Sequence, residues 1–425
     1  MMKKSFFDHI KALFYMRKPS SGAKGRLLTP HSTVGFSPAT TGIETLVFVS
    51  TISLMVMGLL AIYTASSMKG FHQLDDSYVF VRKQLYVALV GLALMSFVTL
   101  WVSSSKAALR KSMRVFLRVF EKSPLIIYVM ILCLLALVLV PGMYSEIGGA
   151  KRWMTLAGVR FQASELAKLA LVLLMARHIS RPSFRIKDVR SGPLSCGMLF
   201  LGYAVFLMLQ PDFGTTVLLA AVCFMMLWVA GLPRVVMSGL VGVGLVLMSV
   251  MIVIAPYRLK RILAFLDPWS QVRGGGFQII QSYVGFQNGG LWGRGLGESK
   301  QKLFFLPEAH TDFILPVIGE ELGLVGVLFV VLSFSTLIYC GFRITQKQKD
   351  GFWYFTCLGI TLTLSIQSVF NMGVAMGLLP TKGIPLPFIS NGASSLVVYV
   401  LMVCILLVAN KRYPIKELAG SLHKT

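Results

Sequence analysis

The sequence predicts an all-α integral membrane protein of about ten transmembrane helices, with one large extracytoplasmic loop between helices seven and eight. Hydrophobic residues make up 55% of the 425 residues and charged residues only 14%, whereas soluble domains carry about 25% charged residues. Apolar runs recur along nearly the whole chain, and a helix needs roughly 20 residues to cross the hydrocarbon. Because these runs lack strand alternation, they are predicted to be helices, which satisfy their own backbone groups in lipid.

The chain divides into a tail, a membrane domain and a second tail. Residues 1–43 are basic and contain Ser, Gly and Pro, so they are predicted to be disordered and cytoplasmic. The membrane domain covers 44–410, and residues 411–425 form a short cytoplasmic tail. No cleavage pattern follows the first apolar run, so no cleavable signal sequence is expected. The predicted spans are 44–66, 82–103, 124–142, 162–180, 193–210, 213–231, 235–256, 311–342, 352–377 and 393–410.

The distribution of Lys and Arg predicts the orientation. With the N-terminus inside, most basic residues fall in cytoplasmic segments, and ten spans return the C-terminus to the cytoplasm. Much of the net charge of +24 is therefore a topology signal, and nucleic-acid binding is not expected. The first tail could equally attract anionic membrane lipids or recruit a soluble partner. The six cysteines form no CxxC and are expected to act as small hydrophobes.

Two outer segments are basic despite this bias. The first is the loop predicted over 257–310, and the second is the stretch GGAKRW (148–153). Cations on the outer face indicate an anionic ligand such as a phosphate. Alternatively, long loops are translocated whatever their charge, and outer headgroups are themselves anionic. The cations are Arg258, Lys260, Arg261, Arg273, Arg294, Lys300 and Lys302 in the loop, and Lys151 and Arg152 before helix four.

Ionisable residues also lie at the membrane edge, where they indicate a functional site. Asp312 lies at the mouth of the eighth span, close to His310, and Glu320 follows inside that span. Glu165 and Lys168 are three residues apart on the fourth span and can pair. That pair serves either as a structural link between helices or as part of a ligand cavity.

Other polar residues have structural explanations. Asp212 is expected to cap the start of the sixth span, and Gln367 and Asn371 to form interhelical hydrogen bonds. Lys382 is the one cation in the proline-rich loop before the last span. The sequence has no GxSxG elbow and no HExxH spacing, so serine hydrolase chemistry and a protein-bound metal are not expected.

Strings such as GGAKRW (148–153), QPDFGTT (210–216) and LPEAHTDF (306–313) lie along nearly the whole chain. Together they resemble one family, the SEDS family (shape, elongation, division and sporulation proteins). LPEAHTDF and GLLPTKG resemble its division branch more than its elongation branch. Ala163 and Asn391 depart from the proline and tyrosine that the family commonly has at these places. The strings are GGAKRW (148–153), FQASELAKLAL (161–171), QPDFGTT (210–216), FLDPW (265–269), GRGLGESKQKLFFLPEAHTDFILPVIGEELGLVG (293–326), NMGVAMGLLPTKGIPLPFIS (371–390) and NGASSL (391–396).

The resemblance implies a peptidoglycan glycosyltransferase of the cytoplasmic (inner) membrane that polymerises lipid II on the outer face, at the division septum. It implies that Asp312 is the essential acidic residue. It also implies a class B penicillin-binding transpeptidase and other division proteins as partners.

The chemistry of such a transfer agrees with the residues. Departure of a lipid diphosphate leaves negative charge for cations to stabilise, and the acceptor hydroxyl needs a base, which we hypothesise is Asp312. The family implies inversion at the anomeric carbon, which one base achieves by direct displacement. The predicted substrate-binding residues are Lys151, Arg152, Glu165, Lys168, Arg258, Arg261, Lys300, Lys302, His310, Glu320 and Lys382.

Alternatives to this interpretation stay open. The sequence requires no cofactor, although a divalent cation such as Mg²⁺ or Mn²⁺ could bridge Asp312 and the diphosphate. A lipid II flippase would also use buried ions and an interrupted membrane segment, and a non-catalytic scaffold of the division machinery is a third class. Polar residues crowd the outer edge with no matching inner cluster, which favours chemistry at the surface over passage through the membrane.

Overall fold

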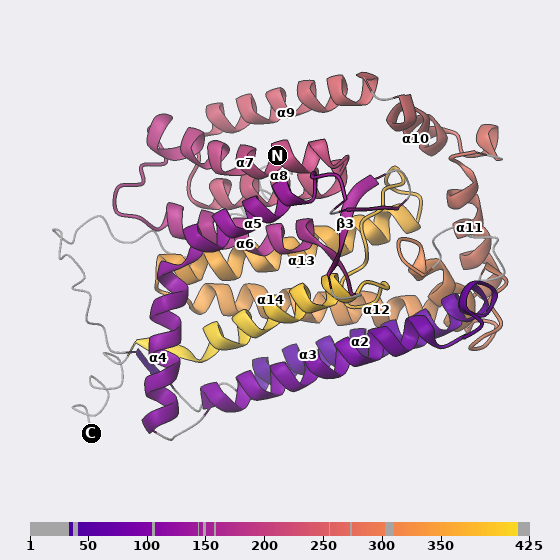
Figure 1. Ribbon diagram of the computed structural model, residues 1–425, viewed down its shortest axis with the longest axis horizontal. Helices are drawn as coiled ribbons and strands as arrows, with labels where there is room; N and C mark the ends of the chain where they lie inside the picture. Colours follow the sequence, from indigo (N-terminus) through magenta and orange to yellow (C-terminus); the bar gives the residue numbers. More distant parts are fainter. Residues whose placement is uncertain are drawn as a thin grey trace, which may run out of the picture.

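The protein is a bundle of long helices, most of which run along one direction of the molecule (Figure 1). The computed structural model describes residues 34–36, 41–103, 107–142, 144–147, 150–156, 159–254, 256–272, 274–301 and 310–414. The predicted all-α membrane class is confirmed, since only short strands accompany the helices in these ranges. The predicted disordered tail and residues 415–425 lie almost entirely outside the described residues.

Each of the ten predicted spans corresponds to a helix. By length and composition, seven helices could cross a membrane, and α5 with the end of α4 forms an eighth candidate that is bent by 58°. The remaining two, α6 and α8, have 17 residues each. The helices are α2 (Thr41–Leu74), α3 (Val79–Ser103), α5 (Pro124–Leu137), α6 (Ala163–Ile179), α7 (Ser195–Leu209), α8 (Phe213–Val229), α9 (Arg234–Ile254), α12 (Ile314–Lys347), α13 (Gly351–Ala375) and α14 (Ala393–Lys411).

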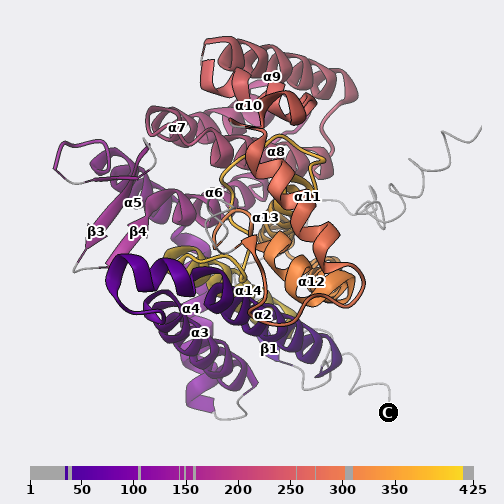
Figure 2. The ribbon, with the colours of Figure 1, turned by 90° about the vertical axis from the view of Figure 1, so that its right-hand side faces the viewer.

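Further elements lie between these helices. The basic segment before α5 forms α4 (Ala107–Lys122), and the segment after α5 forms an antiparallel sheet of β2 (Ser145–Ile147), β3 (Ala150–Leu156) and β4 (Val159–Gln162). Figure 2 shows β3 and β4 extending outward beside α5. The predicted loop 257–310 is largely helical where described, with α10 (Pro256–Leu266), a 3-10 turn (Trp269–Gln271) and α11 (Phe277–Gly289).

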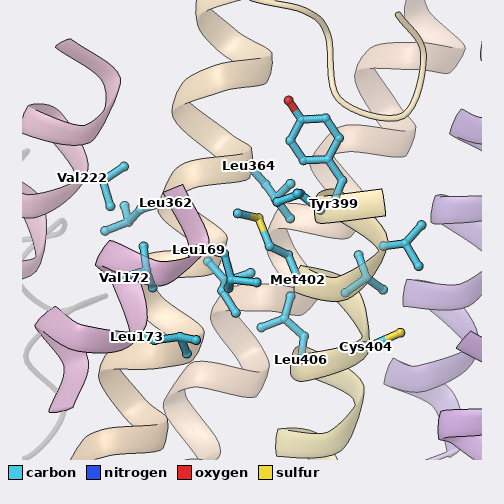
Figure 3. Packing of buried hydrophobic residues seen from close by; sticks show 14 of the residues in the cluster. Leu169, Val172, Leu173, Val222, Leu362, Leu364, Tyr399, Met402, Cys404 and Leu406 are labelled. Atoms are coloured by element: carbon cyan, nitrogen blue, oxygen red, sulfur yellow. The ribbon is translucent and has the colours of Figure 1, made fainter. Parts of the chain in front are cut away.

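The core lies where α6 packs between α8, α13 and α14. Figure 3 shows Leu169 and Val172 of α6 facing Leu362 of α13 and Met402 of α14, and all four are buried. Association of helices in lipid depends on such close packing rather than on the exclusion of water. By contrast, α9 buries none of its residues and lies at the margin of the molecule.

The two ends of the described chain meet at one end of the bundle. The strand β1 (Val34–Phe36) pairs antiparallel with β5 (Arg412–Pro414). Next to this ribbon, the Glu44 carboxylate at the start of α2 accepts a hydrogen bond from Asn410 Nδ2 at 3.0 Å and lies 2.8 Å from Lys411 Nζ. The first and last helices are therefore held together at the same end.

The long helix α12 is broken at Gly323, which has φ 65° and ψ −161°. The backbone of residues 290–295 fills the break. Arg294 N and Gly295 N donate to the carbonyls of Glu320 and Glu321, each at 3.0 Å, and Leu324 N donates to the Gly290 carbonyl at 2.9 Å. These bonds satisfy groups that the interrupted helix leaves open, which a low-dielectric environment requires.

We expect Gly323→Ala to destabilise the protein. A Cβ at this position would lie 2.4 Å from Gly293 N and 2.5 Å from the Leu291 carbonyl oxygen. The positive φ alone costs an alanine on the order of 1–3 kcal/mol. The apparent Tm in detergent should fall by several degrees, whereas Gly244→Ala on α9, where a Cβ meets nothing within 4 Å, should leave it unchanged or slightly higher. Equal melting of G323A and the wild type would contradict this account.

Candidate active site

Asp312 lies in a short turn before α12 that the rest of the protein holds by its backbone. The carbonyls of three consecutive residues accept hydrogen bonds. His310 O accepts from Asn391 N at 3.0 Å, Thr311 O from Ser390 Oγ at 2.5 Å, and Asp312 O from Asn371 Nδ2 at 3.0 Å. Because Asn371 is on α13 and the other two donors precede α14, the turn is fixed between two buried helices.

The Asp312 side chain is half-buried and lies against the loop that joins α13 to α14. A Cβ on Gly383 of that loop would be 2.9 Å from Asp312 Oδ2, so the carboxylate contacts the residue directly after Lys382. The loop itself is held by α13, since Asn371 Nδ2 donates to the Ile384 carbonyl at 2.7 Å and Gln367 Nε2 to the Pro385 carbonyl at 2.9 Å.

Cations from three elements gather beside this loop, and we call Arg152, Arg258, Arg261 and Lys382 the cationic cluster. Lys382 Nζ lies 3.9 Å from the centre of the Phe213 ring, and Arg258 Cζ lies 4.7 Å from the same ring. Arg261 Nη1 donates to the Thr381 carbonyl at 3.4 Å. The aromatic face stabilises positive charge that is partly removed from water.

Burial and the neighbouring charges together lower the pKa of Lys382. Burial is the main cause that lowers its pKa from the ordinary value to about 8; Asp212 opposes this shift, and the like charges of Arg258 and Arg261 add to it. The ammonium of Lys382 therefore loses its proton as the pH rises through about 8, and a bound anionic ligand would favour the protonated form.

Asp212 is the acidic counterpart of the cationic cluster. Its carboxylate caps α8 by accepting from Thr215 N at 3.3 Å and Thr215 Oγ1 at 2.9 Å, which confirms the expected cap. The same carboxylate accepts from Gln162 Nε2 at 3.4 Å and lies 3.8 Å from Arg152 Nη1. It is 3% exposed. Asp212 thus joins α8 to β3 and β4 and offsets part of the local positive charge.

Glu165 and Lys168 lie deeper in the bundle. Lys168 Nζ is 2.9 Å from Glu165 Oε2, and it donates to Gln367 Oε1 at 3.0 Å and to the Tyr399 hydroxyl at 3.4 Å. Both charged side chains are almost fully buried. Gln367 also donates to the Pro385 carbonyl of the loop before α14. The ion pair is therefore linked through Gln367 to the loop that Asp312 contacts.

Glu320 lies in a different environment. Its carboxylate is fully buried and accepts from Asn288 Nδ2 at 3.2 Å, Ser299 Oγ at 2.5 Å and Gln301 N at 3.3 Å. Neither Lys168, which pairs with Glu165, nor Lys382, which lies over the Phe213 ring, is among these partners. Glu320 therefore ties the segment 295–301 to the first part of α12, and these contacts give it no place in the cationic cluster.

The other predicted residues are dispersed. Lys300 is exposed, whereas His310 is buried with its ring 5.7 Å from that of Phe80. Lys151 lies on β3, but its side chain is not among those described, and Lys302 lies outside the described residues. No group of three His, Cys, Asp or Glu residues that could hold a metal ion occurs in the described part of the chain.

Sequence reasoning missed the supporting residues. Asp212 had been explained as a cap, and its second role follows only from Arg152 and Gln162 folding back over α8. The sequence signal for this second role is that Asp212 is predicted to lie at the same membrane face as the basic segments 148–153 and 257–310. Gln367 of α13 bonds between helices as expected, to Lys168 of α6 and Tyr399 of α14. Gln367 and Asn371 also donate to the backbone of the loop before α14, which the sequence did not predict.

The fold and this site define a polytopic helical membrane protein that holds one acidic residue and a group of cations at one end of its helices. Residues 44–413 match the family model for cell cycle proteins of the FtsW/RodA/SpoVE type. The chain belongs to this family, which is the SEDS family that its motifs resemble, and within it the chain is FtsW-like.

Relatives and solved structures agree with this assignment. A probable peptidoglycan glycosyltransferase FtsW from Geobacter metallireducens is 39% identical over 370 residues, which are 87% of this chain and 95% of the relative. The stage V sporulation protein E of Bacillus subtilis is 37% identical over 86% of this chain and 96% of its own length.

Two solved structures share the fold. A peptidoglycan synthase complex that coordinates polymerisation and cross-linking has a chain that superposes with a TM-score of 0.68 at 26% identity, covering 87% of this chain and 97% of that chain. The rod shape determining protein RodA of Thermus thermophilus gives 0.60 at 27% identity, covering 88% and 97%.

The buried ion pair gives a stability prediction. Lys168→Met should destabilise the protein by about 3–5 kcal/mol, because the Glu165 carboxylate would be buried without its cation. The double variant Glu165→Gln/Lys168→Met should recover most of that loss, since no charge is left buried. Thermal unfolding in detergent measures both. A single variant as stable as the wild type would show that the pair does not hold these helices together.

Proposed function

We propose that this protein is a peptidoglycan glycosyltransferase that polymerises lipid II on the outer face of the cytoplasmic membrane during septal wall synthesis. The observation that carries the proposal is the contact of the Asp312 carboxylate with Gly383, directly beside Lys382 of the cationic cluster. The Asp312 carboxylate thus lies against the loop that carries Lys382, and transfer from a lipid diphosphate calls for both a base and cations. The names of the relatives support the same activity.

In the proposed reaction, Asp312 takes the proton of the acceptor sugar hydroxyl as that oxygen attacks the anomeric carbon of the donor. The bond to the lipid diphosphate breaks at the same time, and the configuration at the carbon inverts. Lys382, Arg258 and Arg261 stabilise the negative charge that develops on the departing phosphate. The hydrogen bonds to the backbone carbonyls of residues 310–312 fix the turn and so hold the Asp312 side chain in position for the reaction.

The residues of the site also indicate how a divalent cation would be held. The described part of the chain offers no cluster of three metal-ligating side chains, and Mg²⁺ commonly binds one or two carboxylates together with substrate phosphates. A Mg²⁺ or Mn²⁺ ion would therefore be held by Asp312 and the diphosphate, and would neutralise phosphate charge. The steps proposed for Asp312 and the cationic cluster do not depend on it.

The proposed orientation places Asp312 outside and both termini in the cytoplasm. The pairing of β1 with β5 supports chain ends on the same side. We further propose that a class B penicillin-binding transpeptidase and other division proteins act with the chain, which the fold shared with a polymerising and cross-linking synthase complex supports.

The activity is tested with the Asp312→Asn variant. Loss of the base should lower the rate of polymerisation by about a hundredfold to ten-thousandfold, with little change in the apparent Tm. The assay uses the purified full chain with its transpeptidase partner and lipid II in detergent, followed by separation of glycan products. Glu298→Gln, which removes an exposed acid from the preceding outer segment, is the control and should retain activity.

The same preparation separates the rival classes. Transport of lipid II across the membrane of sealed vesicles, without polymer, would assign the chain as a flippase. The absence of both activities would assign it as a scaffold. Wild-type activity in the Asn variant would remove Asp312 from the mechanism.

The pKa of Lys382 gives a pH prediction. A cation that binds phosphate must be protonated, so kcat/KM should decline as the pH rises through about 8. In Lys382→Arg the guanidinium stays charged throughout this range, so the decline should move to higher pH even if the maximal rate falls. Initial rates with lipid II across the alkaline range measure this. The same decline in both proteins would assign it to another group.

A further inference from the structure

The helix α4 has two chemically distinct faces. Basic residues occupy positions 110, 111, 114, 118 and 122, and at about 100° per residue these positions fall within about 120° of the helix circumference. The apolar positions fill most of the remaining arc. Among the side chains that the structure describes on the basic arc, Arg118 and Lys122 are both exposed.

One edge of the apolar face is attached to the helix bundle. Leu117 is buried, and the Phe120 ring packs 5.9 Å from the ring of Trp353 on α13. On the side of α3, the Trp101 ring lies 5.6 Å from that of Phe116. The helix is therefore held in a defined position against the bundle.

The other edge of the apolar face is uncovered. Val115, Phe116 and Val119 are 52%, 47% and 60% exposed, respectively. The neighbouring spans also expose apolar side chains near α4, such as Leu100 of α3 and Leu125 and Ile126 of α5. Glu121, the one acid of the helix, accepts a hydrogen bond from Trp353 Nε1 at 2.7 Å and so is directed towards the bundle.

The direction of α4 differs from that of the spans. The segment Val115–Lys122 is bent by 58° from Pro124–Leu137, and Figure 1 shows α4 steeply inclined to α3 and α14 near their ends. A helix with an apolar stripe and a basic arc, inclined to the neighbouring spans and beside their ends, has the features of an interfacial helix.

We propose that α4 is a membrane-surface helix that binds anionic phospholipids. The apolar stripe of Val115, Phe116 and Val119 contacts the boundary of the acyl chains, and the basic arc binds anionic headgroups such as phosphatidylglycerol. Each basic residue close to an anionic surface favours binding by about fivefold. A zwitterionic headgroup would leave this charge uncompensated, so the surface selects anionic lipid.

The test compares amide hydrogen exchange of the full-length protein in two kinds of nanodisc, one of phosphatidylcholine and one of equal parts phosphatidylcholine and phosphatidylglycerol. We expect the amides of 107–122 to exchange on the order of tenfold more slowly when phosphatidylglycerol is present. Arg118→Gln/Lys122→Gln removes two of the five basic residues of the arc and should strongly reduce this difference while leaving exchange in α13 unchanged. The control Lys187→Gln/Arg190→Gln removes two exposed charges from the loop between α6 and α7 and should retain the difference.

Three results would overturn the proposal. Equal exchange of α4 in the two lipid compositions would show no preference for anionic headgroups. Loss of the difference in the control variant would show a general effect of charge. Protection of α4 only after addition of a partner protein, in either lipid, would assign the face to a protein contact. Exchange in α13 reports separately whether a variant has kept its fold.

Discussion

The candidate site depends on the hydrogen bonds that tie the carbonyls of residues 310–312 to Asn371, Ser390 and Asn391. The backbone of an irregular turn between buried helices must find partners, because each unsatisfied polar group costs several kcal/mol away from water. Side-chain and loop donors from two elements supply these partners. As a result, the direction in which Asp312 leaves the backbone is set by the packing of α13 and of the loop before α14.

The charges of the cationic cluster are partly balanced by one buried acid. Asp212 lies close to Arg152 and acts on Lys382, whereas Arg258 and Arg261 add positive charge near Lys382. Without that acid, mutual repulsion would oppose the gathering of the cations, and without the cations a buried carboxylate would be costly. A diphosphate that binds there would neutralise the excess positive charge. Its binding would therefore relieve the repulsion among the cations.

The sequence predicted the helices well and the connections poorly. Long apolar runs report burial in lipid directly, so ten spans could be placed from hydropathy, including the short α6 and α8. In amphipathic segments the polar and apolar residues cancel in the mean hydropathy. No helix was therefore predicted at α4, α10 or α11. Asp312 and all four members of the cationic cluster, Arg152, Arg258, Arg261 and Lys382, were singled out from charge and family resemblance. Their convergence was not, because it depends on long-range contacts such as that of Asp312 with Gly383.

Glu320 shows the limit of reasoning from charge alone. A carboxylate inside an apolar run required a partner, and cations were the natural candidates. The structure satisfies it with an amide, a hydroxyl and a backbone N–H from the segment before Asp312. Such neutral donors carry no sequence signal, since Asn, Ser and main-chain groups occur in every loop.

The clamp between Glu44 and residues Asn410 and Lys411 has a consequence for biogenesis. Because a chain is synthesised from its N-terminus, α2 is made well before these two partners, which lie at the end of α14. The two contacts of Glu44 can therefore form only late in synthesis. A protein truncated before residue 410 would lack this link between α2 and α14.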